Sequence, residues 1–225
     1  MASSREIITS RVARFFQSGD VVNLGIGMPE LVGNYMSDGV LLHTENGLLG
    51  YGPGPKPEDQ DDNFIGAGKQ FVTVIPGASC FDSATSFAIV RGGHLAATVL
   101  GTLQVDEKGS LANWTMPGKL VGMGGAMDLV TGARKVIVCT EHNTKNGSPK
   151  ILKNCSLPLT GVGVVDVIVT ELCVLDVTER GLVVREIAPG ISHEELQSRT
   201  EATLIFPEQI GSLNIELDVE TLCNA

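Results

Sequence analysis

The sequence predicts an α/β fold in which an open, mostly parallel sheet is flanked by helices, and three observations lead to this prediction. Short runs rich in valine, isoleucine and leucine alternate with amphipathic segments, which is the order expected of strands and crossover helices. The chain contains 27 glycines and only 4% aromatic residues, which favours many tight turns. Its 225 residues, 43% of them hydrophobic, show no internal repeat or linker, so we expect a single domain over residues 1–225.

The N-terminal part of the chain begins with a predicted helix. Apolar residues at helical spacing place this helix at residues 4–17, and the Gly19-Asp20 pair ends it. A strand is predicted at residues 21–24 and leads into a glycine turn. A second helix opens near Pro29, because proline has no N–H to lose in a first helical turn.

The next predicted strand covers residues 40–45 and ends at Glu45, before an exposed acidic loop at residues 52–63. Open parallel sheets place ligands at the carboxyl ends of their strands, so we expect Glu45 near a binding site. In the rest of the chain, valine-rich runs predict strands, and glycines mark the ends of helices. A capping box at Ser192 and Glu195 predicts the start of a helix. The remaining predicted strands cover residues 71–75, 96–101, 135–140, 164–170, 173–177 and 182–187, and the remaining helices cover residues 82–93, 126–130 and 193–200.

The formal net charge of −10 excludes two classes of partner. A nucleic-acid binder needs a basic surface, and anionic membranes attract clusters of lysine and arginine, so we expect neither nucleic acid nor a membrane as a partner. No apolar run reaches the 18 residues of a membrane span. A polyphosphate ligand would need converging basic residues or cations from a partner chain.

The cysteines and histidines form no metal or disulfide pattern. The five cysteines are odd in number and lack CxxC spacing, and the four histidines include no HExxH pair, so we expect neither a zinc site nor a disulfide framework. Reduced, buried thiols in a cytoplasmic protein are the simpler interpretation. The amphipathic N-terminal stretch lacks the continuous apolar core of a signal peptide, which also favours a cytoplasmic location.

Two glycine motifs are candidate ligand contacts. GIGMPE places Gly25 and Gly27 in a GxG pair, but Glu30 stands where a dinucleotide fingerprint has its third glycine, so a plain strand–helix turn is favoured over a nicotinamide site. In GMGGAM, the backbone N–H groups around Gly124 and Gly125 can form an anion nest or an oxyanion hole. A tight turn before a helix is the simpler alternative.

Glu45, in the stretch LLHTENGLLGYGPGP, has two interpretations. It is an ordinary solvated turn residue, or its carboxylate is a nucleophile that is ionised at neutral pH and needs no partner base. On a strand, His43 would share the face of Glu45, yet a satisfied strand-end histidine explains it equally well. Lys69, in GAGK, does not complete a Walker A loop, because the GxxxxGK[ST] pattern is absent.

Several long motifs, in one order, resemble a known family. VNLGIGMP, TENGLLGYGP, RGGH, LANWTMPGKL and GMGGAMDLVTGARKVIV, with LPLTG later, are similar to the B (β) subunit of 3-oxoacid CoA-transferases, the class I CoA-transferases. The resemblance runs from about residue 5 to about residue 205. It implies the CoA-transferase fold, related to ribose-5-phosphate isomerase-like domains. It also implies an enzyme that moves CoA from an acyl-CoA, such as succinyl-CoA or acetyl-CoA, to a 3-oxoacid or short-chain acid such as acetoacetate.

The resemblance also implies roles for single residues. The family's nucleophile falls on Glu45, which would carry a glutamyl-CoA thioester in ping-pong chemistry. CoA is then a substrate, and neither a permanently bound cofactor nor a metal is implied. The other candidate residues are Gly124, Gly125, Ala126 and Lys69 for the oxyanion and the thioester, and Gly25, Gly27 and Asn46 for substrate binding.

The sequence departs from the family pattern at four places. Thr44 stands where serine is common, Glu30 replaces a usual threonine, and Ala96 replaces a common aspartate or asparagine. The chain is one residue shorter between Val121 and Gly122. This shortening leaves open which N–H of the glycine loop is the donor.

The length of the chain corresponds to one half of the fused chain of some relatives, so the resemblance implies a partner A (α) subunit in an α2β2 heterotetramer. Three alternatives stay open: a 3-oxoadipate CoA-transferase subunit, a non-catalytic ligand-sensing module on the same scaffold, and a nicotinamide-dependent reductase that uses GIGMPE. Fold alone does not decide between them. The glutamate of the ENG motif favours an enzyme, because a sensor needs no nucleophile there.

Overall fold

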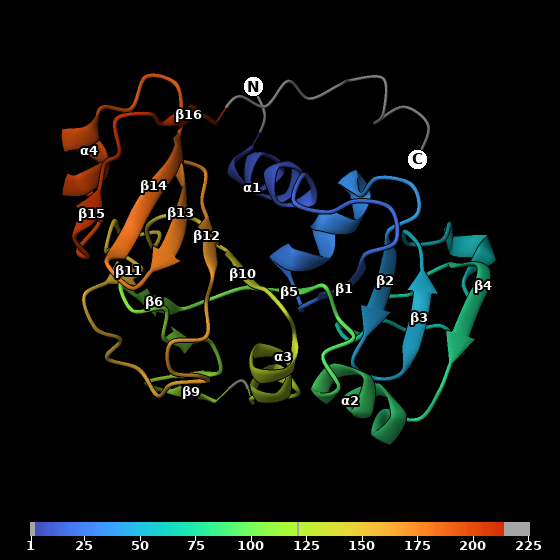
Figure 1. Cartoon of the computed structure of the whole chain (residues 1–225). Coiled ribbons are helices and arrows are strands. Elements are labelled where there is room, and N and C mark those ends of the chain that lie inside the picture. The colour runs from blue at the N-terminus through green and yellow to red at the C-terminus, as the bar shows by residue number, and fades with distance from the viewer. Residues whose placement is uncertain (1–2, 121, 214–225) are drawn as a thin grey trace.

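A large mixed sheet with helices on both faces dominates the computed structural model, which describes residues 3–120 and 122–213 (Figure 1). Its valine-rich strands match the predicted alternation of strands and helices. The strands of this sheet are β1 (Val21–Leu24), β2 (Leu41–Thr44), β3 (Leu48–Tyr51), β4 (Val74–Cys80), β5 (Ala97–Leu100), β10 (Val136–Cys139), β12 (Val167–Val169), β13 (Cys173–Thr178), β14 (Gly181–Ile187), β15 (Leu204–Ile205) and β16 (Gly211–Ser212).

The strand order is β15-β14-β13-β12-β10-β5-β1-β2-β3-β4, and β16 pairs with β14. The centre, from β12 through β10, β5 and β1 to β2, is parallel. Antiparallel hairpins extend it on both sides, β3 and β4 next to β2, and β13 and β14 next to β12. The predicted mostly parallel α/β sheet is therefore confirmed at its centre.

Side chains cap the start of several helices by accepting hydrogen bonds from free backbone N–H groups. Asp82 accepts from the Thr85 N–H at 2.7 Å, and Ser192 accepts from the Glu195 N–H at 3.1 Å, the predicted N-cap. The helices are α1 (Ser4–Ala13), α2 (Ser83–Arg91), α3 (Ala126–Gly132) and α4 (His193–Ser198), with 3-10 helices η1 (Met28–Tyr35) and η2 (Pro57–Asp59). None of the described helices has the length and apolar content needed to cross a membrane.

Side chains of the central strands alternate between two apolar cores. In β10, Ile137 and Cys139 join the core that α1 and η1 cover, whereas Val136 and Val138 join the core that α2, α3 and α4 cover. This period of two is the ordinary alternation of a strand. Burial on both faces explains why these strands are apolar throughout.

Two small sheets lie beside the carboxyl end of β5. In the first, β6 pairs with β7 and β11, and in the second β8 pairs with β9. Their bounds are β6 (Gln104–Asp106), β7 (Leu111–Ala112), β8 (Thr115–Met116), β9 (Lys119–Leu120) and β11 (Ile151–Leu152). None of these strands was predicted, because two- and three-residue strands leave no periodic signal.

Three predicted elements differ from the structure. The first helix ends at Ala13 rather than at residue 17, because Phe15 and Phe16 close tighter turns with N–H bonds to residues three positions earlier. The segment after Pro29 is a 3-10 helix, in keeping with its glycine and its β-branched valine. The strand predicted at residues 71–75 begins only at Val74 and runs on to Cys80.

Candidate active site

Glu45 is the first residue of the three-residue turn that joins β2 to β3. The turn closes with a bond from the Gly47 N–H to the Thr44 carbonyl oxygen at 3.1 Å. Gly47 has a φ of +112°, and a Cβ there would overlap the Phe81 carbonyl oxygen, so only glycine fits. The Phe81 N–H also donates to the Gly47 carbonyl oxygen at 2.9 Å. The ENG turn therefore holds the Glu45 backbone at the carboxyl end of β2, where a site was predicted.

The glycine loop before α3 lies against the Glu45 carboxylate. The Gly125 N–H donates to Glu45 Oε1 at 3.3 Å. Gly125 has a φ of −85°, which any residue adopts, but a Cβ there would lie 2.8 Å from the Phe87 ring and 2.9 Å from Glu45 Oε2. A side chain at position 125 would therefore force the Phe87 ring or the Glu45 carboxylate to move. Gly124 also lies next to the carboxylate, since a Cβ there would be 3.3 Å from Glu45 Oε1, and Ala126 lines the same cleft as Glu45.

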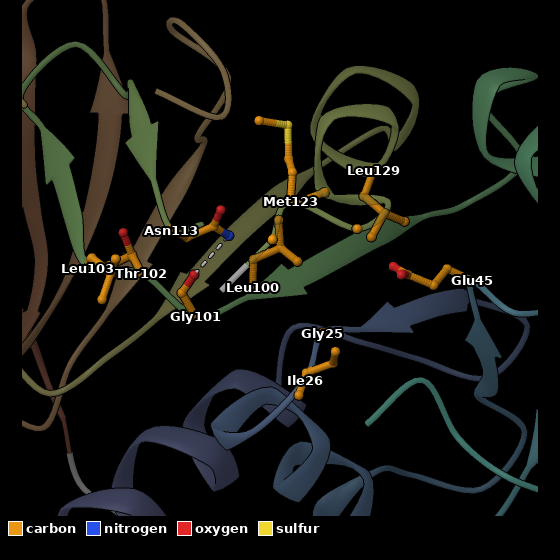
Figure 2. A pocket seen from close by; sticks show the side chains of 13 residues that line it. Gly25, Ile26, Glu45, Leu100, Gly101, Thr102, Leu103, Asn113, Met123 and Leu129 are labelled. Carbon is orange, nitrogen blue, oxygen red and sulfur yellow. Dashed lines mark hydrogen bonds between the residues drawn. The ribbon is translucent and has the colours of Figure 1, made fainter. Parts of the chain in front are cut away.

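A cleft of about 500 Å³ opens in front of Glu45. Figure 2 shows the Glu45 side chain entering from one side, with Leu103, Thr102 and Asn113 on the opposite side. Asn113 donates from Nδ2 to the Gly101 carbonyl oxygen at 3.2 Å, which fixes that wall. The cleft is lined by Gly25, Ile26, Glu45, Leu100, Gly101, Thr102, Leu103, Asn113, Gly122, Met123, Gly124, Ala126 and Leu129.

The GIGMPE turn contributes one side of this cleft. Gly25 follows β1, lines the cleft and donates its N–H to the Val99 carbonyl oxygen at 2.8 Å. Gly27 does not line it; its N–H donates instead to Glu30 Oε2 at 2.9 Å at the start of η1. Gly25 therefore lines the same cleft as Glu45, whereas the Gly27 N–H is used to cap the start of η1.

A buried polar layer lies directly behind Glu45. Asn23, His43, Ser86 and Thr98 are all at most 1% exposed and are joined by hydrogen bonds from Thr98 Oγ1 to Asn23, from Asn23 to His43, and between His43 and Ser86. Burial lowers the pKa of His43 to about 4, so its ring is neutral at physiological pH. The ring is fully buried and does not line the cleft, so the possibility that His43 accompanies Glu45 on the reactive face is wrong.

Lys69 and Asn46 lie outside the residues that line the cleft, although both were candidates. Asn46 Nδ2 donates to the Ile65 carbonyl oxygen at 2.9 Å. Ile65 and Phe71 form a β-bridge that closes a short loop, and Lys69 stands near its tip, exposed and with a φ of +67°. Asn46 therefore connects the nucleophile's turn to the loop that carries Lys69.

The remaining titratable groups give no sign of a metal centre. No group of three or more His, Cys, Asp or Glu in residues 3–120 and 122–213 is arranged to hold a metal ion. Burial raises the pKa of Cys139 and of Cys173 to about 12, so these thiols are inert. Cys80 of β4 is exposed, which corrects the expectation that the thiols are buried. Cys223 and Val121, where the chain was thought to be shorter, lie outside the described residues.

Several residues of the site were not predicted from the sequence. Asn113 and Met123 line the cleft from loops that carry no periodic signal. Phe87 contacts the Gly125 position from α2, a segment for which the sequence predicted only a helix. The motif LANWTMPGKL contained Asn113, but nothing in its spacing indicated that it would line the same cleft as Glu45.

Several known proteins resemble this chain in sequence. Residues 5–198 match the family model described as Coenzyme A transferase. The B subunit of the probable succinyl-CoA:3-ketoacid coenzyme A transferase of Bacillus subtilis is 46% identical over 213 residues, covering 93% of this chain and 99% of its own. The B subunit of the 3-oxoadipate CoA-transferase of Pseudomonas putida is 51% identical over 205 residues, covering 90% of this chain and 96% of its own.

A solved structure shares the fold. The acyl-CoA transferase YdiF of Escherichia coli O157:H7, as apoenzyme, superposes with a TM-score of 0.76 at 21% identity, over 95% of this chain and 44% of that one. This chain therefore spans less than half of the YdiF chain. The family model and the two relatives cover most of this sequence at high identity. The chain therefore belongs to the coenzyme A transferase family, enzymes that move CoA between carboxylic acids.

Proposed function

We propose that the chain is the β subunit of a CoA-transferase in which Glu45 carries CoA as a glutamyl thioester between an acyl-CoA donor and a 3-oxoacid or short-chain acid acceptor. The observation that carries this proposal is the bond from the Gly125 N–H to Glu45 Oε1, at the edge of a cleft large enough for a small acyl group. A carboxylate nucleophile and a backbone N–H donor at one point are what acyl transfer requires.

The reaction begins with attack of a Glu45 carboxylate oxygen on the donor's thioester carbonyl. CoA leaves as a thiolate, and a mixed anhydride of Glu45 and the acyl group forms. The thiolate then attacks the glutamyl carbonyl, the donor acid leaves as a carboxylate, and CoA is bound to Glu45 as a thioester. The acceptor carboxylate attacks this thioester and the same steps run in reverse, which returns a free Glu45 carboxylate and a new acyl-CoA.

The Gly125 N–H stabilises the oxyanion that forms on the Glu45 carbonyl in these steps. It already points at Oε1 in the free protein, so it need not reorient when the negative charge develops. One such donor accounts for roughly a 10²- to 10³-fold rate effect in other acyl-transfer enzymes. Gly124 and Ala126, which also line the cleft, lie on either side of this donor.

The walls of the cleft suit the acyl end of a small substrate. Leu100, Met123 and Leu129 give it an apolar surface, and Thr102 and Asn113 stand opposite Glu45. An apolar wall excludes water from the anhydride and the thioester, both of which water would hydrolyse. The names of both relatives specify acids with a 3-oxo group, and 3-oxoadipate is an acceptor that a substrate panel should include.

Lys69 has a supporting electrostatic role. What supports this role is that its loop is connected to the nucleophile's turn by the bond from Asn46 to Ile65. The lysine takes part in no ion pair among the described residues.

A partner A subunit completes the enzyme, in an α2β2 assembly. Both relatives are named as the B subunits of their enzymes. Apolar side chains are exposed around the cleft: Ile26 lines it and is 63% exposed, and Met127, beside the lining residue Ala126, is 51% exposed. A surface of this kind is typical of a protein interface. A partner seated there would cover the cleft and supply the cations that a chain with net charge −10 lacks.

Mass spectrometry of the complex of both subunits tests the proposal. The complex is incubated with acyl-CoA and reduced with borohydride, which converts a glutamyl thioester to a primary alcohol and releases CoA. We expect the alcohol at Glu45 and nowhere else. A modified residue elsewhere, or none at all under turnover conditions, contradicts the nucleophile assignment. The chain without its partner should show no transfer.

A further inference from the structure

Two adjacent residues of α2, Ser86 and Phe87, contact the two halves of the Glu45–Gly125 pair. Ser86 bonds to His43 and Thr44 of β2, the strand that Glu45 follows, and the Phe87 ring packs where a Gly125 side chain would begin. The two halves come from segments 80 positions apart in the sequence. One short helix therefore contacts both the nucleophile's strand and the oxyanion donor.

The hydrogen bonds on the Ser86 side have only one consistent direction. Asn23 Nδ2 lies 3.3 Å from His43 Nδ1 and 3.2 Å from the His43 carbonyl oxygen, so its two hydrogens go to these two acceptors. His43 Nδ1 is then unprotonated, and Nε2 carries the hydrogen of the neutral ring. That hydrogen goes to Ser86 Oγ, at 3.0 Å.

The chain of bonds ends at the residue before the nucleophile. Because Ser86 Oγ accepts from His43, its own hydrogen is free to go to the Thr44 carbonyl oxygen, 3.4 Å away. At the other end, Thr98 Oγ1 donates to Asn23 Oδ1 at 3.1 Å. Every donor in this series of hydrogen bonds has an acceptor, so the buried network favours a single geometry. It fixes the backbone from which Glu45 extends.

On the Phe87 side the contact is steric. A Cβ at Gly125 would lie 2.8 Å from Cε1 and Cζ of the Phe87 ring, so the ring forms the surface on which the glycine loop rests. The loop leads into α3, and Arg91 of α2 pairs with Asp128 of α3 through Nε and Oδ1 at 2.7 Å. Phe87 thus determines how closely the Gly125 N–H approaches Glu45.

We propose that Ser86 and Phe87 are positioning residues that set the geometry between the Glu45 carboxylate and the Gly125 N–H. This inference rests on the proposed role of Glu45. Ser86 acts through His43 and Thr44, and Phe87 acts through Gly125. Neither residue lines the cleft in which the substrate would bind, so their effect falls on kcat for the chemical steps, while KM for the acyl-CoA is little changed.

A double-mutant cycle in the two-subunit complex tests the role of Phe87. Gly125→Ala should lower kcat about 10²-fold, because the methyl group pushes the N–H away from Glu45. Phe87→Ala alone should lower kcat about tenfold. In the double variant the smaller residue removes the contact of the methyl group with the ring and leaves its contact with Glu45 Oε2, so kcat should be about tenfold higher than in Gly125→Ala without returning to wild type. The control is Ile89→Ala, a change of similar kind on the same helix, which should give no rescue.

The role of Ser86 is tested by comparing a substitution that removes its hydroxyl with one that keeps it. Ser86→Ala should lower kcat about tenfold at unchanged KM, and Ser86→Thr, which keeps the hydroxyl, should recover most of it. The thermal midpoint of each variant is measured alongside, since a structural role alone would lower the midpoint and leave kcat per folded enzyme unchanged.

The outcomes separate this inference from the proposed function. Suppose that borohydride marks Glu45 in the wild-type complex. If Phe87→Ala then gives no rescue of Gly125→Ala, and Ser86→Ala keeps wild-type kcat, the positioning role is overturned. The assignment of Glu45 as the nucleophile is unaffected by that result. If wild type shows no mark on Glu45, the proposed function fails, and the positioning role with it. Rescue by Phe87→Ala and not by Ile89→Ala supports the inference.

Discussion

Glu45 and Gly125 are 80 positions apart in the sequence, and the Gly125 N–H donates to Glu45 Oε1 at 3.3 Å. The contact joins the turn after β2 to the loop before α3, two segments that the parallel sheet brings to the same edge. It places a donor where charge develops during acyl transfer. Activity should therefore depend first on the length and charge of the side chain at position 45.

Shortening Glu45 and neutralising it should both lower the rate of CoA transfer strongly, for different reasons. Glu45→Gln keeps the size of the side chain and an oxygen for the Gly125 N–H, but its amide is no nucleophile, so kcat should fall at least about 10³-fold. Glu45→Asp keeps the charge but withdraws the carboxylate by one methylene, which should lower kcat about 10²-fold or more. Steady-state rates of the complex measure both, and circular dichroism checks the fold. Activity of Glu45→Gln near wild type would contradict the nucleophilic role.

The fold and the position of Glu45 could be predicted because they depend on local signals. Continuous apolar runs marked the parallel strands, and the end of residues 40–45 placed Glu45 at the edge where such sheets bind ligands. The partner of Glu45 could not be predicted from spacing, because which glycine N–H reaches it depends on how α2 packs against α3. The strand β3 was missed because Leu48–Tyr51 is short and contains a glycine.

Asn46→Ala should weaken substrate binding more than chemistry. The substitution removes the bond to the Ile65 carbonyl oxygen and frees the loop that carries Lys69, so KM for acyl-CoA should rise about three- to tenfold with a smaller change in kcat. The control is Asn63→Ala, an exposed asparagine in the acidic loop that bonds only to nearby Asp61 among the described residues. Equal kinetic effects of the two variants would show that Asn46 has no special connection to the site.

Two substitutions of Lys69 separate its charge from its backbone. Lys69 has a φ of +67°, a conformation that costs a non-glycine residue roughly 1–2 kcal/mol. Lys69→Gly should therefore raise the free energy of unfolding by up to about 1 kcal/mol, the gain being reduced by the greater entropy of an unfolded glycine. Lys69→Ala should bring no such gain.

Both Lys69 variants lose the ammonium group and should show the same loss of kcat/KM. Urea unfolding and steady-state kinetics measure the two effects separately. If Lys69→Gly keeps wild-type kcat/KM, the electrostatic role of Lys69 is wrong, whatever happens to stability.

His142 should make stability depend on pH below neutrality. Its ring is fully buried between Thr170, 3.0 Å from Nδ1, and Thr200, 2.9 Å from Nε2. Burial, with a smaller contribution from Arg199, lowers its pKa to about 4. In the unfolded chain a histidine has a pKa of about 6.5. Above that pH the ring is neutral in both states and contributes no pH dependence.

As the pH falls below about 6.5, the unfolded chain binds a proton that the folded protein does not, so stability decreases until the pH reaches about 4. This single group should make the free energy of unfolding about 2 kcal/mol lower at pH 5 than at pH 7.5. His142→Gln keeps a hydrogen-bonding side chain and cannot titrate. The substitution should lower the free energy of unfolding at pH 7.5 by about 1–2 kcal/mol, because the glutamine makes imperfect hydrogen bonds. Between pH 7.5 and pH 5, however, the free energy of unfolding of the variant should decrease by about 2 kcal/mol less than that of wild type. Urea unfolding at the two pH values measures the difference, in which all other titrating groups cancel. An equal loss in variant and wild type would show that His142 takes up its proton equally in the folded and unfolded states.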